Sequence, residues 1–233
     1  MNNQRTDFGI KFNSFFNSLP STLDVPSGVE VLYPYGDSDV KSAVHTFANE
    51  FMSGTNERTF LLGINPGRFG AGVTGISFTD PVHLQNKLNI PNDFEKRAEL
   101  SSTFIYEMIE FLAGPQVFYR NFYIGSVCPL GFVKNGKNLN YYDEPELQQS
   151  LMPFIIDCMN KQVEFGARRD VAYSIGKGKN LKFLKELNKE HKWFGKIKSV
   201  PHPRWVLQYR RKHKNEILKD IFDELAPRLA STV

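Results

Sequence analysis

The stretch RTFLLGINPGRFGAGVTGISF, residues 58–78, decides the fold. It begins with an apolar run, 58–64, that has the length and composition of a buried strand. Five glycines lie within residues 63–78, and glycine lets backbone amides approach a ligand closely. The stretch lacks both the GxxxxGK(S/T) pattern of a phosphate-binding loop and the GxGxxG pattern of a dinucleotide-binding turn. It therefore predicts a strand that runs directly into a glycine-rich loop of another kind.

Three further runs predict strands, at 121–127, 170–175 and 196–200, and Gly or Pro follows each within two residues. Helical spacing of apolar residues predicts helices around 104–112, 151–159 and 217–225, and more weakly at 38–53 and 180–190. Asp37 or Ser38 would cap the helix at 38–53, and Pro153 predicts that the helix around it restarts or bends. Strands that alternate with helices predict an α/β fold, a three-layer α/β/α arrangement around a central, mostly parallel four-stranded sheet.

In such sheets ligands bind at the carboxyl ends of the strands. That rule selects four segments for the chemistry: 65–78, 128–140, 176–180 and the chain from Pro201 onward. The last of these includes Pro201-His202-Pro203, in which the two prolines restrict the backbone around the histidine.

Length and composition predict one domain over residues 1–233, with residues 1–36 as an N-terminal extension of unclear role. Cys128 and Cys158 form no CxxC pattern, so neither a disulfide framework nor a zinc or iron–sulfur site is indicated. The start lacks the pattern of a signal peptide, and no apolar run approaches the length of a membrane span. We expect no metal, no cofactor and no membrane contact, and a monomer in the cytoplasm, or in the nucleus of a eukaryote.

Charge is distributed unevenly. Residues 161–219 hold 17 Lys and Arg against 5 Asp and Glu, a balance of +12, whereas the rest of the chain holds 12 against 20. A basic surface that contacts phosphate explains this asymmetry, and a solvated lysine-rich helix face explains it equally well.

Taken together, the segments resemble the uracil-DNA glycosylase superfamily, most closely its single-strand-selective monofunctional branch. The resemblance rests on Gly63-Ile64-Asn65-Pro66-Gly67 with Phe69-Gly70, Thr74-Gly75 and Phe78, on Cys128-Pro129-Leu130, and on His202-Pro203, in the order and spacing of the family. It covers roughly residues 58–225 and implies hydrolysis of the N-glycosidic bond of a flipped, damaged base in single- or double-stranded DNA.

The resemblance also implies roles for individual residues. Asn65 would hold the attacking water, and His202 would donate a hydrogen bond to the base oxygen that gains charge. The implied base pocket comprises Ile64, Gly67, Phe69, Phe78 and Ser126. The expected DNA-binding residues are Arg68, Lys177, Lys179, Arg204, Arg210, Arg211, Lys212 and Lys214.

The sequence departs from the family pattern at three places. Ser126 stands where the family has an Asn that reads the pyrimidine edge, so hypoxanthine or xanthine joins uracil as a candidate substrate. Arg68 replaces a Pro, and a Ser-Pro is missing before Arg204.

Plainer interpretations remain open for each residue. Asn65 could belong to a simple turn, Phe78 and His202 to ordinary packing, and Ser126 to a strand end whose hydroxyl bonds backbone. A non-catalytic DNA-binding module on the same fold is the main alternative function. A nucleotide site at Gly176-Lys177-Gly178-Lys179 is less favoured, because no Ser or Thr follows to bind magnesium.

Overall fold

The computed structural model describes residues 7–229 and has a four-stranded sheet at its centre. All four strands are parallel, in the order β3-β2-β6-β7: β2 Thr59–Gly63, β3 Phe122–Ser126, β6 Val171–Ile175 and β7 Lys196–Val200. The predicted strand positions are confirmed to within one residue at each end.

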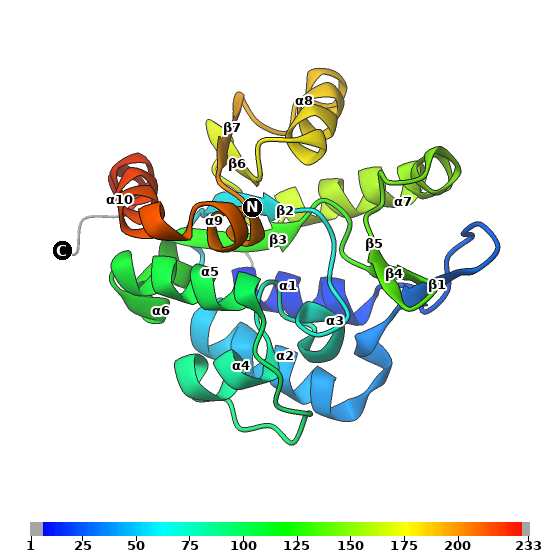
Figure 1. The fold of residues 1–233 in the computed structure, drawn as a ribbon, viewed down its shortest axis with the longest axis horizontal. Helices are drawn as coiled ribbons and strands as arrows, with labels where there is room; N and C mark the ends of the chain where they lie inside the picture. The colour runs from blue at the N-terminus through cyan, green and yellow to red at the C-terminus, as the bar shows by residue number, and fades with distance from the viewer. Residues whose placement is uncertain (1–6, 230–233) are drawn as a thin grey trace, which may run out of the picture.

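Helices cover both faces of this sheet. Four helices lie between β2 and β3 in the chain: the short α3 Ala71–Thr74, α4 Pro81–Leu88, α5 Leu100–Phe111 and α6 Gly114–Asn121. Two more follow the later strands: α7 Pro145–Val163 and α8 Lys179–His191. Figure 1 shows α7 and α8 on one side of the sheet and α5 and α6 on the other. Because both faces are covered, β2, β3 and β6 are buried along their whole length, and the predicted three-layer α/β/α fold is confirmed.

Of the two alternatives predicted at Pro153, a restart or a bend of the helix, the restart in α7 is wrong. The helix α7 continues through this proline as one 19-residue helix and does not restart there. The predicted helix at 38–53 is α2 Ser38–Phe51, and Asp37 caps it by accepting hydrogen bonds from the backbone N–H groups of Asp39 and Val40.

A second, antiparallel sheet was not predicted. It has the order β1-β4-β5, with β1 Val29–Leu32, β4 Gly131–Lys134 and β5 Lys137–Leu139. Asn135 and Gly136, both with positive φ, join β4 to β5. Asn-Gly is a strong sequence signal for a two-residue hairpin turn, so this element could have been found from the sequence.

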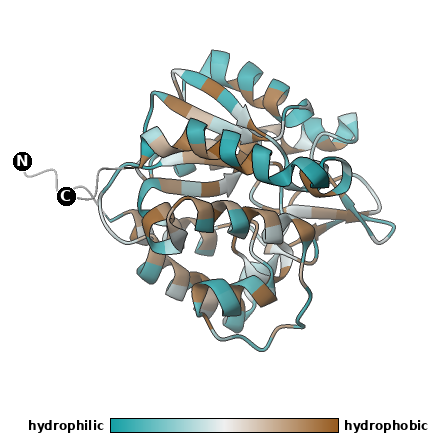
Figure 2. Ribbon diagram, turned by 60° about the vertical axis from the view of Figure 1, so that its left-hand side comes forward, coloured by the Kyte–Doolittle hydropathy of each residue, from teal (hydrophilic) through white to brown (hydrophobic). Residues whose placement is uncertain are grey.

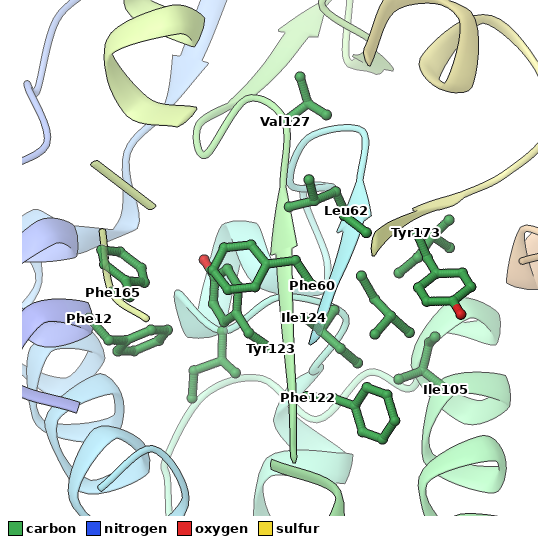
Figure 3. Close-up of a cluster of buried hydrophobic side chains, with 14 of the residues drawn as sticks. Phe12, Phe60, Leu62, Ile105, Phe122, Tyr123, Ile124, Val127, Phe165 and Tyr173 are labelled. Carbon is green, nitrogen blue, oxygen red and sulfur yellow. The ribbon is translucent and has the colours of Figure 1, made fainter. Parts of the chain in front are cut away.

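The N-terminal segment is part of the core. The helix α1 Phe8–Asn17 buries Phe8, Phe12, Phe15 and Phe16. Phe12 lies beside Phe165 in the same cluster as strand residues of the central sheet (Figure 3). Residues 7–36 therefore supply α1, β1 and the 3₁₀ turn η1 Pro34–Gly36, whereas residues 1–6 of the predicted extension lie outside the described part.

The chain after β7 forms α9 Pro203–Tyr209, η2 Arg211–His213, α10 Lys214–Leu225 and η3 Ala226–Arg228. Figure 2 shows hydrophobic residues along the strands and on the helix faces beside them. One hydrophobic cluster extends from Phe8 to Leu225, and on that continuity we propose a single domain. No helix within residues 7–229 has the length and apolar character that a membrane crossing requires.

Candidate active site

A cavity of about 270 Å³ opens where β2 and β3 end. This volume is near the lower limit of small-molecule sites, which begin at roughly 300 Å³. Its walls come from the loop after β2, the end of β3, β5 and the residue after it, the loop before α5 with the start of that helix, and the segment after β7. The lining includes both predicted catalytic residues and the whole predicted base pocket: Asn65, His202, Ile64, Gly67, Phe69, Phe78 and Ser126.

Asn65 lies two residues after the end of β2. Backbone groups at the end of the second sheet fix its side chain. Its Oδ1 accepts a hydrogen bond from the backbone N–H of Tyr141 at 3.1 Å. Its Nδ2 donates to the carbonyl oxygens of Leu139 at 3.2 Å and Pro66 at 3.3 Å. An amide oxygen has two lone pairs, so Oδ1 can still accept one hydrogen bond from a ligand or water. The side chain thus does more than form a turn, because it joins two loops at the cavity wall.

His202 caps the N-terminus of α9 and is half-buried. Its Nδ1 accepts a hydrogen bond from the backbone N–H of Arg204 at 3.2 Å. The neutral ring therefore carries its proton on Nε2, the nitrogen that remains free to donate. Burial first, and the nearby Arg204 second, lower the pKa of His202 to about 4. At neutral pH the cavity therefore contains an uncharged N–H donor.

Phe78 lies against His202, with the two ring centres 6.3 Å apart. Its backbone has φ 54°, a left-handed conformation that is uncommon for a bulky residue and is found mostly at functional or strained positions. Gly63 makes room for the ring, because a Cβ there would lie 2.6 Å from the Phe78 ring. The glycine at the end of β2 and the position of Phe78 thus depend on each other.

Ser126 is the last residue of β3 and pairs with Gly63 across the sheet. It is 6% exposed and lines the cavity, and no hydrogen bond to its hydroxyl occurs within residues 7–229. Its carbonyl accepts a hydrogen bond from Gln162 Nε2 at 3.1 Å, which fixes the backbone but leaves the hydroxyl available. The cavity therefore has a small polar group beside Phe78.

Phe69 is held at the cavity wall by two cations. The guanidinium of Arg97 lies 3.5 Å from its ring centre, and that of Arg68 lies 4.4 Å away. Arg68 is exposed, its backbone N–H donates to Asn138 Oδ1 at 3.1 Å, and its side chain donates to the Gly136 carbonyl.

Apart from Arg68, which lies beside Phe69, the predicted DNA-binding residues form two groups. Arg204 lines the cavity itself and also a neighbouring cleft of about 700 Å³, which shares His202 with it. Lys177 and Lys179 line this second cleft, where the Lys179 ammonium lies 5.7 Å from the Tyr142 ring centre. The remaining predicted DNA-binding residues lie farther along the segment: Arg210, Arg211, Lys212 and Lys214.

The members of the second group differ in their contacts. Arg210 packs near Trp205, with 5.6 Å between the guanidinium and the ring centre. Arg211 and Lys212 are exposed on η2, whereas Lys214 forms an ion pair with Glu107 at 2.8 Å. The structure therefore brings Arg204, Lys177 and Lys179 to the site and places Arg68 beside Phe69 at the cavity wall. It leaves the other four predicted residues on the adjoining surface.

Seven polar lining residues were not predicted as site residues: Ser77, Arg97, Glu99, Ser101, Asn138, Asn140 and Gln208. Asn138 and Asn140 belong to the segment 128–140, which was predicted to lie at a strand end. Their position in that segment could therefore have identified them as candidate site residues. Arg97 and Glu99 lie in the loop before α5, which has no motif to identify it. Among the described residues, no group of three His, Cys, Asp or Glu side chains could hold a metal ion.

Comparison with known proteins identifies the family. A model of the Uracil DNA glycosylase superfamily matches residues 51–226, more than half of the chain. Two relatives, from Rattus norvegicus and Mus musculus, are single-strand selective monofunctional uracil-DNA glycosylases, each 29% identical over 161 residues. These matches cover 61% of this chain and 57% of each relative, so the chain aligns with little more than half of their length.

The same fold occurs in a solved structure. The crystal structure of wild-type SMUG2 from Pedobacter heparinus is 38% identical, with a TM-score of 0.91. The similarity covers 95% of this chain and 98% of that chain. The resemblance drawn from the sequence motifs is therefore confirmed at the level of the superfamily and of its single-strand-selective branch.

Proposed function

The chain belongs to the uracil-DNA glycosylase superfamily, and from that membership we propose that it excises uracil from DNA by hydrolysing the N-glycosidic bond. The observation that carries the proposal is the meeting of Asn65, His202 and Phe78 in one cavity. A base in a duplex cannot reach such a cavity, so the nucleotide must be flipped out or already be single-stranded.

His202 would stabilise the leaving base. As the glycosidic bond breaks, the base gains negative charge and the sugar becomes cation-like. The Nε2–H of a neutral His202 is a donor already in place for a base oxygen, and preorganised donors of this kind are the most effective in a water-poor site. Phe78 would stack on the base and offset part of the cost of removing it from the helix.

Asn65 would hold the attacking water. Its amide is a poor proton acceptor, so its contribution is to position the water. The hydrogen bonds from Tyr141 and to Leu139 fix the direction of its free lone pair, which supports this role.

The choice of base depends on Ser126. A serine hydroxyl offers one donor and its lone pairs, whereas an asparagine amide presents a donor and an acceptor side by side and can bind two atoms of a base at once. The shorter serine also leaves more space for a larger base. We propose that hypoxanthine or xanthine is accepted alongside uracil. We further propose single-strand preference, since the relatives are named for it, and phosphate contacts from Lys177, Lys179 and Arg204.

We also propose that the reaction is monofunctional. Cleavage of the DNA strand by a glycosylase needs an amine that forms a Schiff base with the sugar. No lysine is among the described residues that line the cavity.

The test is a gel assay with single- and double-stranded oligonucleotides that contain uracil, hypoxanthine or xanthine, in the presence of EDTA. We expect base release that leaves an intact abasic site, cleaved by heat or alkali. Strand scission without that treatment, trapped by borohydride, would contradict monofunctionality. DNA binding without any base release would instead identify the chain as a non-catalytic DNA-binding module.

A further inference from the structure

Glu99 is the one acidic residue among the described residues that line the cavity. It stands at the N-cap of α5, but its side chain makes no capping hydrogen bond. Within residues 7–229 the half-buried carboxylate has neither a hydrogen bond nor an ion pair within 4 Å. An unpaired carboxylate inside a cavity is costly, and such groups concentrate at functional sites.

The carboxylate lies against the loop that carries Asn65. A Cβ at Gly70 would collide with Glu99 Oε2, and a Cβ at Gly67 would lie 3.9 Å from Oε1. Glycine at position 70 therefore leaves the space that the carboxylate occupies. The acid and the catalytic amide thus share one wall of the cavity.

A hydrogen-bond network outside the cavity holds Glu99 in place. Asp80 is fully buried and accepts a hydrogen bond from the Glu99 backbone N–H at 2.7 Å. Asp80 also accepts from the backbone N–H groups of Val82 and His83, both at 2.9 Å, and pairs with His83 Nδ1 at 2.8 Å. Asp80 is thus a positioning residue that ties the start of α5 to the start of α4.

We propose that Glu99 accepts the proton of the attacking water, a role that rests on the proposed glycosylase function. The C1′–N bond breaks and its electron pair leaves with the base. The water oxygen bonds to C1′ and its proton passes to the Glu99 carboxylate. The released base then takes up a proton from Glu99 or solvent, so that free base and an abasic sugar result. Asn65 positions the water, and Glu99 supplies the basicity that an amide lacks.

The electrostatic surroundings suit a proton acceptor. Burial first, and Asp80 second, raise the pKa of Glu99, while Arg204 and Arg97 act in the opposite direction. Among the described residues, the charged groups that act on it are Asp80 at the N-cap of α4, Arg97 from the same loop and Arg204 from α9, and His202 lines the same cavity. Because the pKa of His202 is lowered to about 4, His202 stays largely uncharged above pH 5 and contributes little to a loss of rate there.

The experiment measures single-turnover excision of uracil from single-stranded DNA between pH 5 and pH 8. Glu99→Gln keeps the size of the side chain and removes its basicity. At pH 8 we expect a loss of about 100-fold, the lower end of the range for general acid–base groups, because a cation-like sugar demands little from the base. The wild-type rate should fall as the pH drops through the pKa of Glu99, and this dependence should be absent in the variant.

Two controls separate chemistry from structure. Glu95→Gln removes an exposed carboxylate from the same loop and should leave the rate unchanged. Affinity for an oligonucleotide with 2′-fluorodeoxyuridine, whose fluorine blocks the cationic transition state, should be the same in wild type and Glu99→Gln. In Glu99→Ala, added formate should restore part of the rate.

Each outcome supports or overturns the proposed role of Glu99. A wild-type rate in Glu99→Gln overturns the proposal. So does a reduced rate that keeps the wild-type pH dependence and resists formate, because Glu99 would then only support the loop. If the wild-type protein itself releases no base, the glycosylase function fails and this proposal fails with it.

Discussion

Two regions meet at the cavity and are built in opposite ways. The first region, here called the fixed region, comprises the loop after β2 with Ser126 and His202 beside it in the cavity. Backbone groups hold it, as the hydrogen bonds of Asn65 to Tyr141 and Leu139 show. The segment from Arg204 to Lys214 instead exposes its cations, and Lys214 alone among its predicted DNA-binding residues forms an ion pair. Tyr209, in the same segment, is 70% exposed.

The difference corresponds to two physical tasks. A donor stabilises the charge of a transition state only when it lies at hydrogen-bond distance from the atom that gains the charge. Such donors must therefore be fixed before the substrate arrives. Attraction of a phosphate backbone acts over longer distances and tolerates mobile side chains. Substitutions in the first region should therefore change the rate, and those in the second region should change the affinity.

The largest effect is expected from Asn65→Ala and His202→Ala. Each should lower single-turnover excision by at least about 100-fold, the scale of losing one preorganised group, while DNA binding changes much less. Excision under enzyme excess and binding to an uncleavable oligonucleotide measure the two properties separately. A wild-type rate in either variant would remove that residue from the mechanism.

Much of this region could be predicted because its signals are local. The apolar runs and the glycines after residue 63 specify strands and a loop, and parallel strands place their carboxyl ends together. The second sheet was missed although Asn135-Gly136 signals a hairpin, and with it the backbone groups that hold Asn65.

Other features had no local signal. Glu99 reaches the cavity from a loop without a motif, and its position depends on the contact with Asp80, 19 residues away. The phenylalanines of α1 were assigned to an extension, because the burial of that helix depends on residues as distant as Phe165. The spacing of apolar residues within one segment does not indicate which distant segment it packs against.

A smaller effect is expected from Ser126→Asn, which changes the side chain that lines the cavity at the end of β3. Asparagine offers a donor and an acceptor, so it can form a two-point contact with the edge of uracil. The uracil-to-hypoxanthine ratio of excision rates should rise by about 10- to 100-fold, near the discrimination of about 1–3 kcal/mol from one bidentate pair.

Both rates must be measured in both proteins, since a general loss of activity would not alter the ratio. Thermal unfolding checks that the buried site accommodates the larger side chain. A folded variant with an unaltered ratio would place Ser126 outside base recognition.

The smallest effect is expected in the exposed region, from the double substitution Arg210→Ala with Arg211→Ala. Each phosphate contact to single-stranded DNA contributes about −0.7 to the slope of log affinity against log salt, so losing two should flatten the slope by about 1.4. Excision at saturating protein should stay close to wild type, because neither residue lines the cavity.

The matched control is Lys182→Ala with Lys185→Ala, which removes two exposed cations of α8 from the same basic stretch. If both pairs flatten the slope equally, attraction is spread over the whole basic stretch. If neither does, these cations face solvent and the contrast between the two regions is wrong.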